Sequence, residues 1–217
     1  MTMVIAIDSK APPRPSKRRT QEERTASTRQ ALFEAAVRTI DRLGYAGANN
    51  ATIADDAGIS RGAITHHFST RAAFMAEVVH WVFDQETRLF RDLMKQRHVG
   101  ARVSDWPALL WDVFSRPSGV AVFEILVASR SDPELAALVL PMQEKIEKTG
   151  ASNFMHMVGE GDSNMAAIRL VVWAIRGMTV GRSFINDPEG MDQAVGVLSR
   201  LLERAGPSGR FADLQSI

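Results

Sequence analysis

The sequence contains no cysteine among its 217 residues, which excludes disulfide bonds, thiolate nucleophiles and thiolate metal sites. The absence also fits a cytoplasmic protein, because disulfides persist mainly in oxidising compartments. Long hydrophobic runs are missing as well: no stretch approaches the roughly 20 apolar residues of a membrane span. The apolar patch at residues 3–7 is too short for a signal peptide. We therefore expect a cytoplasmic protein that does not contact the membrane.

A strong charge of either sign is also absent. Lysine and arginine together number 26 against 25 acidic residues, so the formal net charge is only +1. A generally basic protein that coats nucleic acid is therefore excluded, and any anion-binding surface must come from the local placement of charges. Hydrophobic residues make up 45% of the chain, enough for a substantial core in one large domain or two small ones.

The most informative stretch is NNATIADDAGISRGAITHHFSTR at residues 49–71. Asn49 can cap a first short helix through its side-chain oxygen. Gly58 can end that helix, since glycine adopts the left-handed conformation at a helix C-terminus without steric cost. Ser60 then occupies the cap position of a second helix, at about 61–68. This pattern predicts a helix-turn-helix whose second helix lies in the major groove of DNA.

The stretch resembles the N-terminal domain of the TetR (tetracycline-repressor) family of bacterial transcriptional regulators. The resemblance runs from about residue 28 to 79 and rests on Ile53, Ala54, Ala57, Gly58, Ile59, Ser60, Gly62, His67, Phe68, Thr70 and Arg71. It implies a three-helix DNA-binding domain, a helical domain that binds a small effector, and a homodimer. Beyond this stretch, only length and helical character agree with the family.

The position of a side chain on the recognition helix decides whether it can reach DNA. The N-terminal end of a recognition helix enters the groove, so Arg61, Gly62 and Thr65 should face bases. Arg61 can donate two hydrogen bonds to guanine, worth about 1–3 kcal/mol of discrimination. The resemblance places the other contacts at phosphates, and Arg18 and Arg19 are candidates for phosphate neutralisation. The predicted DNA-binding set is Asn50, Ser60, Arg61, Gly62, Ala63, Thr65, His66, His67, Arg71, Arg18 and Arg19.

Two features depart from the family pattern. Thr65 stands where the family usually has tyrosine, so an aromatic contact is missing. Asp55 and Asp56 would repel a duplex if they faced it, and we expect them to point toward the first helix or solvent. The operator sequence therefore cannot be copied from a relative.

The spacing of apolar residues and the positions of helix-ending glycine and proline predict an all-α chain. We expect three parts: a flexible basic tail at 1–20, the helix-turn-helix domain at 21–70 and a helical regulatory and dimerisation domain at 71–217. The first helix should span about 24–43 and end at Gly44. A long connecting helix should follow from the cap Thr70 to about 97. Further helices are expected at about 105–114, 118–130, 134–158, 164–186 and 188–205, and 208–217 should be a loose tail.

Aromatic residues and methionines in the C-terminal helices suggest a largely apolar effector pocket, although most of these side chains should be plain core. The predicted ligand-binding set is Trp106, Trp111, Phe114, Phe123, Met142, Trp173 and Arg176, with Arg130 and His156 as other candidate polar anchors. The last two helices should form the homodimer through Ile168, Val172, Ile175, Thr179, Val195, Leu198 and Leu202. The alternative is that these stripes face the core of their own chain.

Two other functional classes remain open at this point. A helical enzyme is disfavoured because we find no GxSxG, phosphate loop, metal-ligand cluster or paired carboxylates at catalytic spacing. Adjacent His66 and His67 point about 100° apart on a helix, so they do not suggest a metal site. A protein-interaction module is the second alternative. We predict a non-enzymatic regulator without cofactor or metal that binds a palindromic double-stranded operator as a homodimer. We expect a repressor rather than an activator. A small hydrophobic effector should release it from the operator.

Overall fold

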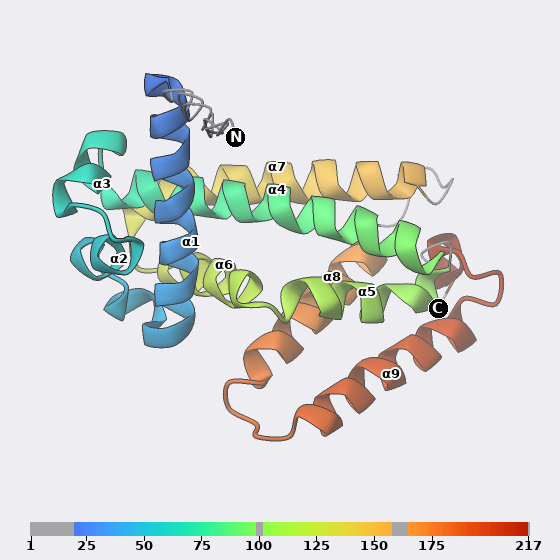
Figure 1. Cartoon of the computed structure of the whole chain (residues 1–217). Helices are drawn as coiled ribbons and strands as arrows, with labels where there is room; N and C mark the ends of the chain where they lie inside the picture. Colours follow the sequence, from blue (N-terminus) through green and yellow to red (C-terminus); the bar gives the residue numbers. More distant parts are fainter. Residues whose placement is uncertain (1–19, 99–101, 158–164, 217) are drawn as a thin grey trace, which may run out of the picture.

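The computed structural model describes residues 20–98, 102–157 and 165–216, and the regular structure of this part is helical, without strands, as predicted (Figure 1). Its α-helices are α1 (Gln21–Gly47), α2 (Asn50–Ala57), α3 (Arg61–His67), α4 (Arg71–Arg97), α5 (Trp106–Phe114), α6 (Pro117–Ala128), α7 (Pro133–Met157), α8 (Met165–Gly181) and α9 (Pro188–Ala205). Two 3₁₀ turns, η1 (Val103–Asp105) and η2 (Phe211–Ser216), complete the chain. None of the helices so described is long and apolar enough to cross a lipid bilayer.

The first helix begins three residues earlier than its pattern of apolar residues predicts. Thr20 accepts a hydrogen bond from the backbone N–H of Glu23, and the Glu23 carboxylate accepts one from the N–H of Thr20. This reciprocal capping box fixes the start of the helix ahead of its first buried residue. Gly44 interrupts the helix at the predicted place, with a φ of 72° that favours glycine.

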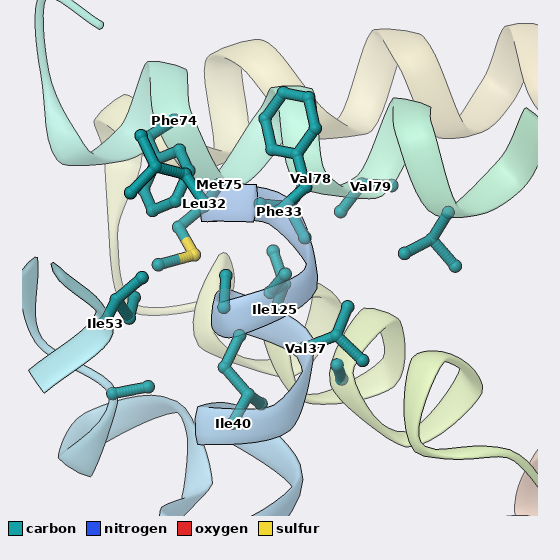
Figure 2. Packing of buried hydrophobic residues seen from close by; sticks show 14 of the residues in the cluster. Leu32, Phe33, Val37, Ile40, Ile53, Phe74, Met75, Val78, Val79 and Ile125 are labelled. Carbon is teal, nitrogen blue, oxygen red and sulfur yellow. The ribbon is translucent and has the colours of Figure 1, made fainter. Parts of the chain in front are cut away.

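The core around the helix-turn-helix is shared by α1, α2, α3 and the first half of α4, and it continues into α6 and α7. Figure 2 shows Leu32, Phe33 and Val37 of α1 facing Phe74 and Val78 of α4. The residues of α4 that face this core recur at three- and four-residue steps, as a helix with one buried face requires.

A second core is built from α5, α8, α9 and the C-terminal half of α4. The final segment belongs to this core, so the prediction of a loose tail over 208–217 is wrong. Phe211 is almost fully buried, and its ring meets that of Trp106 edge-on at 4.4 Å between centroids. A single aromatic residue in a polar segment has no periodicity to reveal it.

Candidate DNA-binding interface and ligand cavity

The caps of the two short helices fix the geometry of the turn. The Asn49 side chain accepts a hydrogen bond from the N–H of Thr52 at 3.0 Å, as the sequence predicts. Gly58 adopts the left-handed conformation at the end of α2, with a φ of 67°. Ser60 occupies the N-cap position of α3, but its side chain makes no capping bond. Ser60 is exposed at the N-terminal end of α3.

The polar side of α3 is turned to solvent. Ile64 is buried within the chain, whereas Ser60, Arg61, Gly62, Thr65 and His66 are exposed and Ala63 and His67 are half-buried. The Arg61 side chain is 72% exposed, and within the described part of the chain it forms one ion pair, with Asp55 at 3.5 Å. Such a loose surface pair holds Arg61 weakly, so the guanidinium is available for a ligand.

Asp56 points toward the first helix, as expected. Its carboxylate pairs with Arg38 at 2.8 Å and with Arg42 at 3.4 Å. Asp55 is exposed and lies beside Arg61. The negative charges of α2 are therefore partly compensated by arginines of α1 and α3.

Arg71 holds the helix-turn-helix together from the start of α4. Its Nη1 donates to the carbonyl of Ala48 at 2.7 Å and to Asn50 Oδ1 at 3.4 Å, and its Nη2 donates to the carbonyl of Tyr45 at 3.0 Å. The guanidinium also lies over the Tyr45 ring at 4.8 Å. These bonds use most of the donors that a phosphate contact would need. The structure therefore gives Arg71 and Asn50 a structural role that sequence reasoning missed.

The half-buried His67 carries little positive charge near neutral pH. Burial lowers the pKa of its imidazole, and the neighbouring His66 and Arg29 lower it further. A neutral imidazole can still donate one hydrogen bond. Arg18 and Arg19, the predicted phosphate contacts of the tail, lie outside the described residues.

A partly open cavity of about 160 Å³ lies between α4, α5, α7 and α8. Four of the predicted ligand-binding residues line it: Trp106, Phe114, Trp173 and Arg176. Phe83 and Phe90 of α4 add further apolar wall, and Glu86 adds a carboxylate.

The other predicted ligand-binding residues do not line this cavity. Trp111 is turned toward α9, where its Nε1 donates to Asp192 at 2.8 Å. Met142 packs against the core around the helix-turn-helix, and Phe123 is half-buried on α6 away from the cavity lining. Arg130 is exposed at the end of α6, and the side chain of His156 lies outside the described part.

The predicted dimer residues pack largely within their own chain, which is the alternative left open by the sequence. Val172 and Leu198 are half-buried, and Ile168, Ile175, Thr179, Val195 and Leu202 are buried. The apolar side chains that α8 and α9 do expose are Leu170, Trp173, Val197 and Leu201. Both faces of these helices carry apolar residues, so periodicity alone does not show which face would meet a second copy.

A short helix with an exposed polar side, packed on a preceding short helix and carrying an exposed arginine at its N-terminal end, is the arrangement of a helix-turn-helix motif. Residues 32–78 match the family of bacterial regulatory proteins, tetR family. The match covers α2, α3 and the adjoining parts of α1 and α4, and it therefore includes the whole helix-turn-helix.

Two relatives are named as transcriptional regulators of the helix-turn-helix type. The chain is 28% identical over 199 residues to the uncharacterized HTH-type transcriptional regulator Rv2912c of Mycobacterium tuberculosis, covering 85% of this chain and 97% of the relative. It is 40% identical over 75 residues to the HTH-type transcriptional regulator CymR of Pseudomonas putida, covering 35% of this chain and 37% of that protein.

Solved structures share the fold. A transcriptional regulator from Rhodococcus sp. Rha1 gives a TM-score of 0.59 at 19% identity, covering 81% of this chain and 96% of that one. The multidrug binding protein EbrR complexed with ethidium gives 0.54 at 21% identity, covering 80% and 97%.

Proposed function

We propose that this regulator is a repressor that binds a palindromic operator as a homodimer in the cytoplasm and leaves it when a small, largely apolar effector binds. The predicted division into a tail at 1–20, a head at 21–70 and a body at 71–217 is part of the proposal. The observation that carries it is the pairing of an exposed recognition surface on α3 with an apolar cavity farther along the chain. Both adjoin α4: its N-terminal turn holds the helix-turn-helix through Arg71, and its C-terminal half lines the cavity.

The DNA-contacting surface in this proposal is the exposed end of α3. Arg61 and Thr65 read bases, and Ser60, Gly62 and His66 lie beside them on the same exposed surface. Ala63, His67, Asn50, Arg71, Arg18 and Arg19 remain proposed phosphate contacts, with Asn50 and Arg71 acting chiefly by holding the turn. Selection of bound duplexes from random DNA, at stated salt, tests this directly. We expect a two-fold symmetric site with half-sites about one helical turn apart or a multiple of it. Recovery of unrelated sequences would contradict the proposal.

Dimerisation is assigned to the exposed faces of α8 and α9. Leu170 and Leu201 are 66% and 57% exposed, and large apolar side chains exposed on the surface are candidates for an interface. Two such helices from each copy would make a four-helix bundle.

A charge on this face should separate the two copies. We expect Leu170→Glu combined with Leu201→Glu to raise the dimer dissociation constant at least tenfold, since buried unpaired carboxylates are costly. Sedimentation equilibrium measures the change. The matched control is Leu140→Glu on α7, where the leucine is 54% exposed and the dimer should persist. A double variant that stays dimeric would place the interface elsewhere.

A hydrogen bond from α6 is among the contacts that join the body to the head. Glu124 of α6 accepts a hydrogen bond at 2.5 Å from the backbone N–H of Tyr45, just after the break in α1. Tyr45 is in turn held by Arg71 through its carbonyl. This chain of contacts offers a route for coupling the two sites, for which about 1–3 kcal/mol would be sufficient.

Removing the Glu124 carboxylate should weaken this connection. We expect Glu124→Ala to lower the free energy of unfolding by about 2 kcal/mol, because a hydrogen bond to a charged acceptor is lost and a part-buried donor is left unpaired. Urea titration followed by circular dichroism measures the change. Glu144→Ala, which removes an exposed carboxylate on α7, should stay within about 0.5 kcal/mol of the parent. Equal effects of the two variants would show that the Tyr45 contact contributes nothing.

A further inference from the structure

The cavity contains two polar groups in otherwise apolar walls. Glu86 projects from α4 and Arg176 from α8, and their side chains are only 7% and 9% exposed. The nearest approach of the two charges is 3.7 Å, between Glu86 Oε2 and Arg176 Nη2. This separation is too long for a direct hydrogen bond. The Phe114 ring covers the guanidinium at 4.1 Å.

Each group also presents an unused atom. Within the described part of the chain, Glu86 Oε1 and Arg176 Nη1 are buried and have no hydrogen-bond partner. Buried polar atoms are nearly always paired, because leaving one without a partner costs about 1–3 kcal/mol. Because both residues line the cavity, a polar molecule bound there could supply the partner that each of these atoms lacks.

Above about pH 7 the Glu86 carboxyl is ionised, and binding is therefore measured above this pH. The signs of the two charges then decide what the ligand can be. A cation would be attracted by Glu86 and repelled by Arg176, and an anion would meet the reverse, so the net attraction for either is small. A neutral hydroxyl group both donates and accepts through one oxygen atom. It can therefore satisfy both unused atoms without adding a charge.

The size of the cavity limits the rest of the molecule. A cavity of about 150 Å³ lined by apolar side chains holds one benzene ring, and this one measures about 160 Å³. We propose that it binds an uncharged aromatic hydroxyl compound of a single ring, whose O–H donates to Glu86 and whose oxygen accepts from Arg176. This inference rests on the proposed function in naming the class of its effector.

Four ring compounds of nearly equal size test the class: 4-methylphenol, toluene, benzoate and benzylammonium. Trp106 and Trp173 line the cavity, so binding to the full-length protein can be followed by tryptophan fluorescence and checked by calorimetry. We expect 4-methylphenol to bind at least about tenfold more tightly than each of the others, since two hydrogen bonds to charged groups exceed the 1.4 kcal/mol of a tenfold ratio. A charged compound that binds most tightly, toluene that binds equally well, or no binding of 4-methylphenol would each overturn the inference.

Two variants show whether the preference comes from this site. Glu86→Leu combined with Arg176→Met replaces both charges by apolar groups, a change that buried ion pairs often tolerate. We expect 4-methylphenol and toluene then to bind within about threefold of each other. Gly150→Leu gives an independent variant, because Gly150 lines the cavity on α7 and a Cβ there meets nothing within 4 Å. Its side chain should fill the space and abolish binding of every compound, and retained binding would contradict the location.

Release of DNA separates this inference from the proposed function. If 4-methylphenol is preferred but leaves the operator complex intact, the ligand class stands and the effector role fails. If the dimer binds a palindromic operator but shows no preference for the hydroxyl compound, the proposed function stands and this inference fails.

Discussion

Replacing Arg61 by alanine should weaken binding of the dimer to its selected operator by about 2–6 kcal/mol. Each bidentate contact between arginine and guanine contributes about 1–3 kcal/mol, and a symmetric site contains two such contacts. Arg61 is suited to this because it is 72% exposed and held only by a 3.5 Å pair with Asp55. Fluorescence anisotropy with a labelled duplex, at one stated salt concentration, measures the loss.

The same variant should relax preference at one base pair in each half-site. A repeat of the duplex selection with Arg61→Ala would reveal this, because a lost base contact changes the recovered sequence whereas a lost phosphate contact weakens all sequences alike. Arg88→Ala is a matched control, since Arg88 is also exposed but lies 17 residues along α4 from Arg71. If both variants bind the operator as the parent does, α3 is not the reading helix.

Stability should depend on pH through Glu86. Burial raises the pKa of this carboxyl from 4.5 to about 7, and Arg176 offsets only part of that rise. The folded state therefore holds a proton that the unfolded chain has released between these two values. The stabilisation from this proton is complete below about pH 4.5 and is lost as pH rises to about 7. At 1.36 kcal/mol per pH unit, the loss is about 3 kcal/mol.

The variant Glu86→Gln isolates this contribution, because glutamine has no proton to lose. We expect the parent to lose about 3 kcal/mol relative to the variant between about pH 4.5 and 7, measured by urea unfolding of both proteins in the same buffers. Other titrating groups are common to both proteins and cancel in the difference. A constant difference across this range would mean that Glu86 has the same pKa in the folded and unfolded states.

The local chemistry of the helix-turn-helix made it the most predictable part of the chain. Asn49 and Gly58 act at the ends of α2 as their residue types require. The capping box of Thr20 and Glu23 was equally readable but was missed, because the apolar pattern of α1 begins several residues later. The family resemblance suggested phosphate contacts for Arg71, and only the folded chain reveals the carbonyl groups that surround it.

Only some of the residues that line the cavity could be predicted from the sequence. Residue type and the family resemblance together select Trp106, Phe114, Trp173 and Arg176, and the structure places all four in the wall of the cavity. Glu86 was missed because a glutamate on a long helix is usually solvated. A signal was present, since Val78, Val82, Glu86 and Phe90 follow at four-residue steps and all are buried. What periodicity cannot supply is the partner, because Arg176 lies 90 residues farther along the chain.

The uninterrupted course of α4 has a mechanical consequence. Fifteen residues separate Arg71 from Glu86, a lever arm of about 22 Å at 1.5 Å per residue. A pivot of about 5° at the cavity end would sweep the other end sideways by about 2 Å. In a symmetric dimer the two displacements would change the distance between the recognition helices by about 4 Å. The half-sites of an operator lie about 34 Å apart. Side-chain repacking around one bound ring could produce a rotation this small. The spacing of the two recognition helices would then no longer match that of successive major grooves.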